Sequence, residues 1–337
     1  MIAVDKLSKT FTMKNSGGFG QKPKVVRAVD QVTLRWDKGK FLVVVGESGC
    51  GKSTLGRMLA GLIPSSSGTM AHDGTLLKKR IGFTHREWAR IVQLIPQDPY
   101  AAINPVRKVR SLFKDPLLYH HMVPKNQVNE RIETLLSMVG LNPKNVLTKY
   151  PHQLSGGQRQ RLVVARALTV DPEYLVADEA VSMVDVSLRI GIMDSLKEIS
   201  LERELGLLFI THDFRVARYI AQNGTIAVMY LGRIVEQGPS EVIISHPMHP
   251  YTQSLISAVP VLEGREKRIN DIVPVRFDLT AVPDEAGCSF APRCPFADEQ
   301  CHTMTPTLKP GESAEHVVAC HYAEPREVVV DIPANVG

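Results

Sequence analysis

The stretch Gly46-Glu-Ser-Gly-Cys-Gly-Lys52-Ser53-Thr54 decides the fold of this chain. It follows the apolar run Phe41-Leu-Val-Val-Val45, which predicts a buried parallel strand, and precedes Leu55-Gly-Arg-Met-Leu-Ala60, which predicts a helix. A glycine-rich turn between a strand and a helix is the context of a phosphate-binding loop, in which backbone N–H groups and the helix N-terminus face an anion. The stretch therefore predicts a nucleotide-binding α/β core.

The loop gives two of its side chains specific expected roles. Lys52 is expected to reach the β and γ phosphates of a nucleotide, and the hydroxyl of Ser53 to ligate Mg²⁺. Cys50 is expected to fill space within the loop and not to bind a metal. The loop residues expected to surround the nucleotide, besides Lys52 and Ser53, are Ser48, Gly49, Cys50, Gly51 and Thr54.

Size and charge narrow the class of protein. The 337 residues are enough for about two domains of roughly 150 residues each. Lys and Arg number 40 against 35 for Asp and Glu, so the net charge of +5 is too mild to indicate a nucleic-acid or anionic lipid partner. No apolar run approaches the roughly 18 residues of a membrane-spanning helix, and Met1-Ile-Ala-Val-Asp-Lys6 lacks the pattern of a signal peptide. We expect a cytosolic chain that serves any membrane process by docking onto other subunits.

Strand and helix signals alternate along residues 1–245. Residues 1–95 carry strand signals, interrupted by an insertion rich in Gly and Lys, Met13 to Lys24, which we expect to be a mobile loop. Over about residues 97–165 apolar residues recur every three to four positions, which predicts a helical subdomain inserted into the core. Strand signals then return, so the chain predicts a mostly parallel sheet with helices on both faces. The later strand runs are Leu175–Ala177, Leu207–Ile210 and Thr225–Leu231, with an amphipathic stretch at Ile190–Leu205; the helical spacing is that of Val128, Ile132, Leu135, Leu136 and Val139.

The composition changes after residue 245. Half of the 22 prolines and four of the five cysteines fall in residues 246–337. This change predicts a separate, loop-rich C-terminal module. No internal repeat or low-complexity tract is present.

Two acids end the strand Tyr174-Leu-Val-Ala177. The carboxyl ends of parallel strands meet at one edge of a sheet, so Asp178 and Glu179 are expected near the phosphate-binding loop. Asp178 is expected to hold Mg²⁺ through its water shell, and Glu179 to polarise a water that attacks the γ phosphate. The alternative is a solvated acidic pair at a strand end.

Two further polar residues follow strands of the same expected sheet. His212 comes after Leu207–Ile210 and is expected to hydrogen-bond the γ phosphate and the attacking water, although a lone histidine is more often a packed or surface residue. Gln97 comes after Ile91–Ile95 and is expected to contact Mg²⁺ and to report its presence to the helical subdomain.

The phrase Leu154-Ser-Gly-Gly-Gln158 predicts a second anion site. It precedes the helix pattern Arg159–Leu168, whose N-terminus offers free N–H groups, while the two glycines permit close approach and Ser155 adds a hydroxyl. Because one ATP has one γ phosphate, a second site in the same chain implies a second protomer. The alternative is an ordinary glycine turn with a serine cap.

Together these phrases resemble the ATP-binding subunit of an ABC transporter, over about residues 1–245. The resemblance implies a P-loop NTPase core with a mostly parallel sheet, an antiparallel β subdomain and an inserted helical subdomain. It also implies that two ATP molecules are held between two subunits, the phosphate-binding loop of one facing the Leu-Ser-Gly-Gly-Gln phrase of the other.

The resemblance assigns roles to single residues. Phe11 would stack on adenine, Gln97 would be the Q-loop glutamine and His212 the switch histidine. Two departures stand out: Ala180 stands where the family usually has proline, and the D-loop Ser182-Met-Val-Asp185 replaces Ser-Ala-Leu-Asp. Neither removes a catalytic group, so hydrolysis is expected to survive. The residues expected to act on the partner's ATP are Ser155, Gly156, Gly157, Gln158 and Asp185.

The C-terminal module resembles that of the dipeptide and oligopeptide importer branch, whose relatives also move nickel or oligosaccharides. The phrases that carry this resemblance are His249-Pro-Tyr-Thr-Gln253 and the run from Cys288 to Cys301. The four cysteines lack the paired C-x2-C knuckles usual for zinc, and stable disulfides are not expected in the cytosol. The resemblance points to a [4Fe-4S] cluster. The alternatives are zinc, for which His302 and His321 next to two of the cysteines are possible ligands, and the absence of any metal. The expected ligands are Cys288, Cys294, Cys301 and Cys320.

The resemblance implies a set of partners. They are a second, similar but distinct ATPase subunit, two transmembrane permease subunits and, indirectly, an extracytoplasmic substrate-binding protein, which places the chain peripherally on the cytoplasmic face of the membrane. The rival hypothesis is a soluble ABC ATPase that acts on DNA or the ribosome, disfavoured because the chain has one set of motifs and no heptad run. A non-hydrolysing binding module is disfavoured because Lys52, Asp178, Glu179 and His212 are all present.

Overall fold

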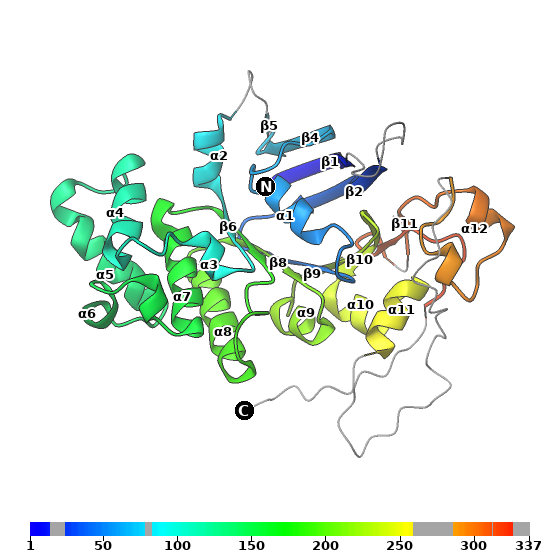
Figure 1. The fold of residues 1–337 in the computed structure, drawn as a ribbon. Helices are drawn as coiled ribbons and strands as arrows, with labels where there is room; N and C mark the ends of the chain where they lie inside the picture. The colour runs from blue at the N-terminus through cyan, green and yellow to red at the C-terminus, as the bar shows by residue number, and fades with distance from the viewer. Residues whose placement is uncertain (14–23, 78–82, 259–285, 312, 326–337) are drawn as a thin grey trace, which may run out of the picture.

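The computed structural model describes residues 1–13, 24–77, 83–258, 286–311 and 313–325, which form two β-sheets flanked by helices (Figure 1). Most of the insertion expected to be a mobile loop, Met13 to Lys24, lies outside these ranges. None of the helices in the described ranges is long and apolar enough to cross a lipid bilayer.

The larger sheet confirms the expected parallel core. Its strand order is β11-β12-β10-β9-β3-β8-β7-β6, and the pairs from β9 to β6 are parallel. Ile95 lies opposite Ala177 and Val45 opposite Thr211, so the carboxyl ends of these strands share one edge. The parallel strands are β3 (Phe41–Val45), β6 (Val92–Ile95), β7 (Tyr174–Asp178), β8 (Gly206–Thr211) and β9 (Thr225–Tyr230).

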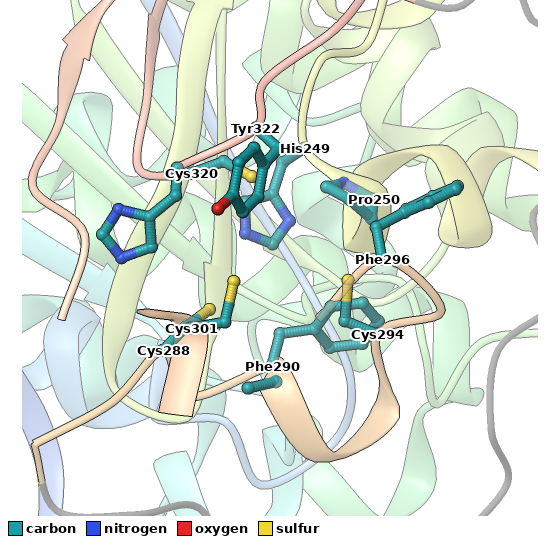
Figure 2. Close-up of a pocket in the computed structure, with 11 residues that line it drawn as sticks. His249, Pro250, Cys288, Phe290, Cys294, Phe296, Cys301, Cys320 and Tyr322 are labelled. Atoms are coloured by element: carbon teal, nitrogen blue, oxygen red, sulfur yellow. The ribbon is translucent and has the colours of Figure 1, made fainter. Parts of the chain in front are cut away.

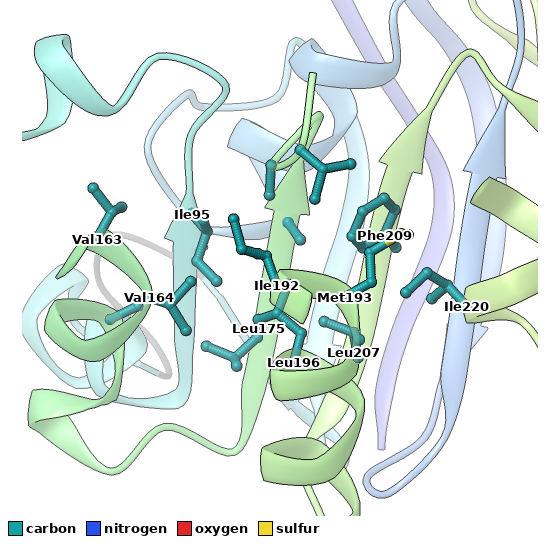
Figure 3. Close-up of a cluster of buried hydrophobic side chains, with 14 of the residues drawn as sticks. Ile95, Val163, Val164, Leu175, Ile192, Met193, Leu196, Leu207, Phe209 and Ile220 are labelled. Atoms are coloured by element: carbon teal, nitrogen blue, oxygen red, sulfur yellow. The ribbon is translucent and has the colours of Figure 1, made fainter. Parts of the chain in front are cut away.

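This sheet separates two hydrophobic cores. Along β3, Leu42 and Val44 enter one core and Val43 and Val45 the other, as the two-residue period of a strand requires. Because both faces are buried, the strands read as continuous apolar runs in the sequence. In one core, Ile192, Met193 and Leu196 of α8 lie against Leu175, Leu207 and Phe209 of the strands (Figure 3).

The smaller sheet is antiparallel, with strand order β2-β1-β4-β5. Its inner residues share the second core with α1, the helix that follows the phosphate-binding loop. Trp36 makes an edge contact with Tyr174 of the larger sheet, with 4.8 Å between ring centroids. The elements are β1 (Ile2–Met13), β2 (Lys24–Trp36), β4 (Ser67–His72), β5 (Thr75–Leu76) and α1 (Lys52–Leu59).

A helical subdomain follows β6 and lies at one end of the molecule (Figure 1). The residues whose spacing predicted a helix, from Val128 to Val139, are all buried. Its helices are α3 (Pro99–Ala102), α4 (Val109–Tyr119), α5 (Val128–Met138), α6 (Pro143–Val146) and α7 (Gly156–Ala167). The other helices of the core are α2 (His85–Ile91), α8 (Val186–Glu202), α9 (Phe214–Ile220) and α10 (Ser240–Ser245).

The C-terminal extension, which the sequence predicts to be a separate module, is joined to the core sheet through its described residues. Val317 and Val318 of β12 pair antiparallel with β10, which continues the sheet beyond β9. The added strand satisfies backbone groups that β10 would otherwise leave at an open edge. The core strand is β10 (Arg233–Pro239), and the elements of the extension are α11 (Pro250–Ser257), the short helix Ala291–Arg293, α12 (Glu299–Thr303), β11 (Lys309–Pro310) and β12 (Val317–Val318).

A buried carboxylate holds the extension against the core. Glu236 of β10 is fully buried and accepts hydrogen bonds from the N–H groups of Met248 and His249, at 2.7 and 3.0 Å. Its Oε1 also lies 2.8 Å from Nε2 of the buried His316. Burial lowers the pKa of His249 to about 4, so this ring is neutral and its Nδ1 accepts the N–H of Tyr251 at the start of α11.

Candidate functional site

The phosphate-binding loop connects the carboxyl end of β3 to α1, as the sequence predicts. Gly51 precedes the first helical residue with φ of 108°, and a Cβ there would lie 1.9 Å from the carbonyl oxygen of Ala28. A Cβ on Gly46 would lie 2.1 Å from the carbonyl oxygen of Met229. Both contacts are with backbone atoms, so glycine is required at these positions if the loop is to pass between β2 and β9.

The side chain of Lys52 is buried beneath the loop. Its ammonium donates hydrogen bonds to the carbonyl oxygens of Gly46 and Glu47, each at 2.8 Å. A phosphate in the loop would compete with these carbonyls for the same three N–H donors. Cys50 is also buried, with its sulfur 3.8 Å from the ammonium.

Ser53 and Asp178 meet beside the loop. The hydroxyl of Ser53 donates to Oδ1 of Asp178 at 2.8 Å. Asp178 is buried, and burial raises the pKa of its carboxyl against the opposing effect of the Ser53 hydrogen bond. A hydroxyl and a carboxylate oxygen at this separation fit the hard, oxygen-only ligand preference of Mg²⁺.

Glu179 lies between Gln97 and His212. The amide of Gln97 donates to Oε2 of Glu179 at 2.9 Å, and Nδ1 of His212 lies 3.3 Å from Oε1. Glu179 has a φ of 46°, a left-handed conformation that is uncommon for a residue with a side chain and recurs at functional sites. The structure therefore brings together three of the polar residues that the sequence places at the ends of different strands.

The Leu-Ser-Gly-Gly-Gln phrase begins α7 in the helical subdomain. Ser155 caps this helix: its hydroxyl accepts the N–H of Gln158, and the Gln158 side chain accepts the N–H of Ser155 at 3.1 Å. A Cβ on Gly156 would meet no atom of the described chain within 4 Å. Gly157 packs against Leu188 of α8, and a Cβ on Gly157 would lie 3.0 Å from the Leu188 side chain. The helix N-terminus is thus open on the side of Gly156.

Phe11 and Asp185 are both exposed. Phe11 lies on β1 opposite Val26, and the ammonium of Lys9 lies 5.2 Å from the centre of its ring. Val26 is two positions before Ala28, the residue of β2 that touches the phosphate-binding loop. Asp185 precedes the first residue of α8.

The four cysteines of the extension line one pocket. Cys288, Cys294, Cys301 and Cys320 surround a common space together with Phe290 and other residues (Figure 2). Their thiols are free, and burial raises the pKa of Cys294 and of Cys320 to about 11. Within the described ranges no group of three or more His, Cys, Asp or Glu side chains is arranged to hold a metal ion.

The two histidines considered as possible zinc ligands, His302 and His321, differ in their position relative to this pocket. His321 is one of its lining residues, and its Nε2 lies 2.9 Å from the carbonyl oxygen of Met304. His302 lies in α12 next to Cys301. Four thiols in one small pocket form a donor set of the kind that binds iron–sulfur clusters.

The sequence did not reveal two residues that contact the phosphate-binding loop, Tyr251 and Arg293. The N–H of Glu47 donates to the hydroxyl oxygen of Tyr251 at 2.9 Å, and the guanidinium of Arg293 donates twice to the Glu47 carboxylate. Tyr251 and Arg293 lie within the two C-terminal phrases that the sequence singles out. Nothing in those phrases indicates a partner more than 200 positions away.

Comparison with family models gives two matches. A model described as ABC transporter matches residues 29–182. A second, described as Oligopeptide/dipeptide transporter, C-terminal region, matches residues 235–301.

Curated relatives match over nearly the whole chain. The chain is 40% identical over 324 residues to oligopeptide transport ATP-binding protein AppF of Bacillus subtilis, which covers 95% of this chain and 97% of that protein. It is 38% identical over 331 residues to oligopeptide transport ATP-binding protein OppF of Escherichia coli, covering 96% and 97%. It is 36% identical over 319 residues to dipeptide transport ATP-binding protein DppF of Haemophilus influenzae, covering 94% and 95%.

Solved structures share the fold. A dimeric ATP-binding cassette bound to ADP and Pi in a post-hydrolysis state aligns with a TM-score of 0.61 and 24% identity, over 71% of this chain and 99% of that one. The cbiO1 protein of Clostridium perfringens, part of the cbiONQ transporter complex, aligns with a TM-score of 0.57 and 22% identity, over 72% and 89%. At these identities the likeness shows the fold alone, and the fold is that of the ABC ATPase cassette.

Proposed function

Because the chain belongs to the ABC transporter family, we propose that the carboxyl edge of its core sheet binds ATP with Mg²⁺ and hydrolyses it through Glu179. The chain is an ATP-binding and ATP-hydrolysing subunit of an importer of the dipeptide and oligopeptide type. The rival hypothesis of a soluble ABC ATPase acting on DNA or the ribosome is not favoured. The observation that carries the mechanism is the meeting of Ser53 with Asp178, and of Gln97 and His212 with Glu179, at one sheet edge.

The loop and its neighbours bind the nucleotide. The ammonium of Lys52 leaves its loop carbonyls for the β and γ phosphates, and the loop backbone from Ser48 to Thr54 surrounds them. Phe11, exposed on β1, stacks on the adenine. Ser53, Asp178 and Gln97 hold Mg²⁺, which when bound screens the negative charge of the phosphates.

Glu179 and His212 act on the attacking water. The Glu179 carboxylate lies largely shielded from solvent, with 12% of its side chain exposed, and so keeps its acceptor strength for a single water in line with the γ phosphate. The ring of His212, on the other side of the carboxylate, hydrogen-bonds the γ phosphate and the water. Gln97 connects these groups to the helical subdomain, because it lies between β6 and α3.

A second ATPase subunit completes each site. The open helix N-terminus at Gly156 supplies N–H groups to the γ phosphate held by the partner subunit. Two observations support this arrangement: the phrase lies in the helical subdomain while the phosphate-binding loop lies on the core sheet, and a cassette of the same fold is dimeric. The residues that act across the interface are Ser155, Gly156, Gly157, Gln158 and Asp185, and the partner is a similar but distinct subunit.

The assembly imports its cargo at a membrane. The chain docks through its helical subdomain onto two permease subunits at the cytoplasmic face, and an extracytoplasmic substrate-binding protein delivers the cargo. Peptides are the proposed cargo, because the relatives that span this chain are named for oligopeptide and dipeptide transport. Nickel or an oligosaccharide is the alternative.

The four thiols of the C-terminal pocket would hold a metal centre, with a [4Fe-4S] cluster as the proposed occupant and zinc as the alternative. The support is the chemistry of the donor set, four thiols on one pocket within the segment that spans Cys288 to Cys320. Cys288, Cys294, Cys301 and Cys320 would hold the cluster, which would link the segments of the extension that carry these cysteines.

ATP turnover by the assembled complex tests the proposed function. The unaltered complex is expected to hydrolyse ATP, and Lys52→Ala is expected to weaken nucleotide binding itself, because the buried ammonium is the loop's main positive charge. Isothermal titration of the full chain with ATP and Mg²⁺ measures the binding step separately. Equal affinity of the Lys52→Ala and unaltered chains would refute the assignment of the site.

A further inference from the structure

Glu47, the second residue of the phosphate-binding loop, is held on three sides. Its carboxylate receives two hydrogen bonds from the guanidinium of Arg293, each 2.9 Å long. Its N–H donates to the hydroxyl oxygen of Tyr251, and its carbonyl oxygen accepts from the ammonium of Lys52. Glu47 therefore connects the lysine proposed to bind the phosphates with two residues of the C-terminal extension.

Arg293 is fixed by its surroundings. Its guanidinium lies 5.7 Å from the ring centres of both Tyr230 and Phe290, and 13% of its side chain is exposed. These two rings and that of Tyr251 pack against one another with centroid separations of 4.6 to 5.4 Å. A planar guanidinium packed beside two aromatic rings loses little further freedom when it makes a two-pronged bond to a carboxylate.

The loop contains glycines, so contacts from other parts of the chain help to fix its conformation. Gly49 and Gly51 both have positive φ, and glycine restricts the backbone less than any other residue. A loop that samples several conformations binds its ligand more weakly, in proportion to the fraction that is competent. Restraint of Glu47 from outside the loop is therefore expected to raise nucleotide affinity.

We propose that Arg293 and Tyr251 are positioning residues of the ATP site, which hold the phosphate-binding loop in its binding conformation through Glu47. The inference rests on the proposed function of the loop. Both residues come from the C-terminal extension and not from the loop. The extension therefore contributes to the conformation of the ATP site. Arg293 lies between Cys288 and Cys294, which places the restraint beside the cysteine pocket.

Removal of the guanidinium tests the proposal. Arg293→Ala is expected to raise the Kd for ATP with Mg²⁺, measured by isothermal titration of the full chain, by about tenfold, within the usual range of coupling between two sites. In the assembled complex it is expected to raise KM for ATP by a similar factor and to leave kcat nearly unchanged. A merely structural role would lower the active fraction, and with it the apparent kcat, without raising KM.

Companion variants separate the contact from the fold. Arg293→Lys keeps the charge but not the two-pronged geometry, so it is expected to restore only part of the affinity. Tyr251→Phe removes only the hydroxyl that accepts the Glu47 N–H and keeps the ring packing, so it remains informative if Arg293→Ala fails to fold. The double variant Glu47→Ala/Arg293→Ala is expected to bind no more weakly than Arg293→Ala alone, because the two act through one contact.

A matched control is Arg203→Ala. Arg203 also donates a hydrogen bond of 2.9 Å to a carboxylate, that of Asp171. Asp171 lies just before the amino end of β7, whereas the phosphate-binding loop lies at the carboxyl edge of the sheet. This variant is expected to leave Kd and KM unchanged. If Arg293→Ala and Tyr251→Phe bind ATP as the unaltered chain does while Lys52→Ala does not, the proposal is overturned and the proposed function stands. If the unaltered chain does not bind ATP, the proposed function fails and this inference with it.

Discussion

The side-chain amide of Gln97 donates a hydrogen bond to the carboxylate of Glu179, with 2.9 Å between Nε2 and Oε2. Gln97 follows the edge strand of the parallel sheet and precedes the helical subdomain, while Glu179 follows the adjacent strand. The bond therefore joins the acid proposed to polarise the water to the point where the helical subdomain is attached. We therefore expect a movement of that subdomain to change the environment of Glu179.

Glu179→Gln is expected to separate ATP binding from hydrolysis. Glutamine keeps the size of the side chain but cannot accept a proton from water, so ATP turnover of the assembled complex is expected to fall by about 10²- to 10⁴-fold. ATP affinity is expected to remain, and the two ATPase subunits are expected to stay associated around uncleaved ATP. Turnover and size-exclusion chromatography with ATP check the two parts, and undiminished turnover would remove Glu179 from the mechanism.

Ser155→Arg is expected to act on the partner's nucleotide. A long side chain at the open N-terminus of α7 blocks approach of a phosphate, whereas the phosphate-binding loop of the same chain is untouched. ATP binding by the single chain, measured by titration calorimetry, is expected to be unchanged, and ATP-dependent association with the second ATPase subunit to be lost. Loss of ATP binding by the isolated chain would instead place Ser155 in its own subunit's site.

Much of this site follows from the sequence, because parallel strands end at a common edge. Once Tyr174–Asp178 and Gly206–Thr211 are recognised as strands, Glu179 and His212 must lie close together. The same reasoning places Gln97 beside Glu179. Two features had no such signal. The strand Val317–Val318 is too short to show a period, and the contact of Glu47 with Arg293 spans 246 positions between polar residues that carry no pattern.

Gly51→Ala is expected to abolish nucleotide binding. A Cβ would lie 1.9 Å from the carbonyl oxygen of Ala28, so either the loop or β2 must move. Gly74→Ala is the matched control: its φ of 79° is also positive, but a Cβ there meets no atom of the described chain within 4 Å. The control is expected to cost only about 1 to 2 kcal/mol of backbone strain and to keep ATP affinity. Thermal unfolding and ATP titration of both variants distinguish the two effects, and full ATP affinity in Gly51→Ala would show that the clash is relieved without disturbing the loop.

Substitution of the pocket cysteines tests the proposed metal centre. Anaerobically purified chain is expected to contain iron and acid-labile sulfide, and Cys294→Ser and Cys320→Ser are each expected to lower both contents. Zinc without sulfide would support the alternative occupant. Cys50→Ala is the control, because Cys50 is buried in the phosphate-binding loop. This variant is expected to leave the metal content unchanged. Chain free of both metals after anaerobic purification would contradict the proposal.

Glu236→Ala is expected to loosen the C-terminal extension from the core sheet. The substitution leaves two buried N–H groups, those of Met248 and His249, without their acceptor and removes the partner of His316. Breaking a buried polar contact of this kind costs about 3 to 5 kcal/mol. We expect a lower free energy of unfolding in urea and faster proteolysis within the extension than within the core.

Glu236→Gln and Glu241→Ala are comparison variants that are expected to lower the free energy of unfolding less than Glu236→Ala. Glutamine keeps one carbonyl acceptor but turns an N–H₂ group toward groups that donate, so its cost is expected to be about 1 to 3 kcal/mol. Glu241 is exposed in the first turn of α10, where loss of a carboxylate costs about 0.3 to 1 kcal/mol. Arg293 and Tyr251 belong to the extension and are proposed to hold the phosphate-binding loop, so Glu236→Ala is also expected to weaken ATP binding. Glu241→Ala is expected to leave ATP binding unchanged. An extension that detaches while ATP affinity stays unchanged would show that the phosphate-binding loop keeps its conformation without Arg293.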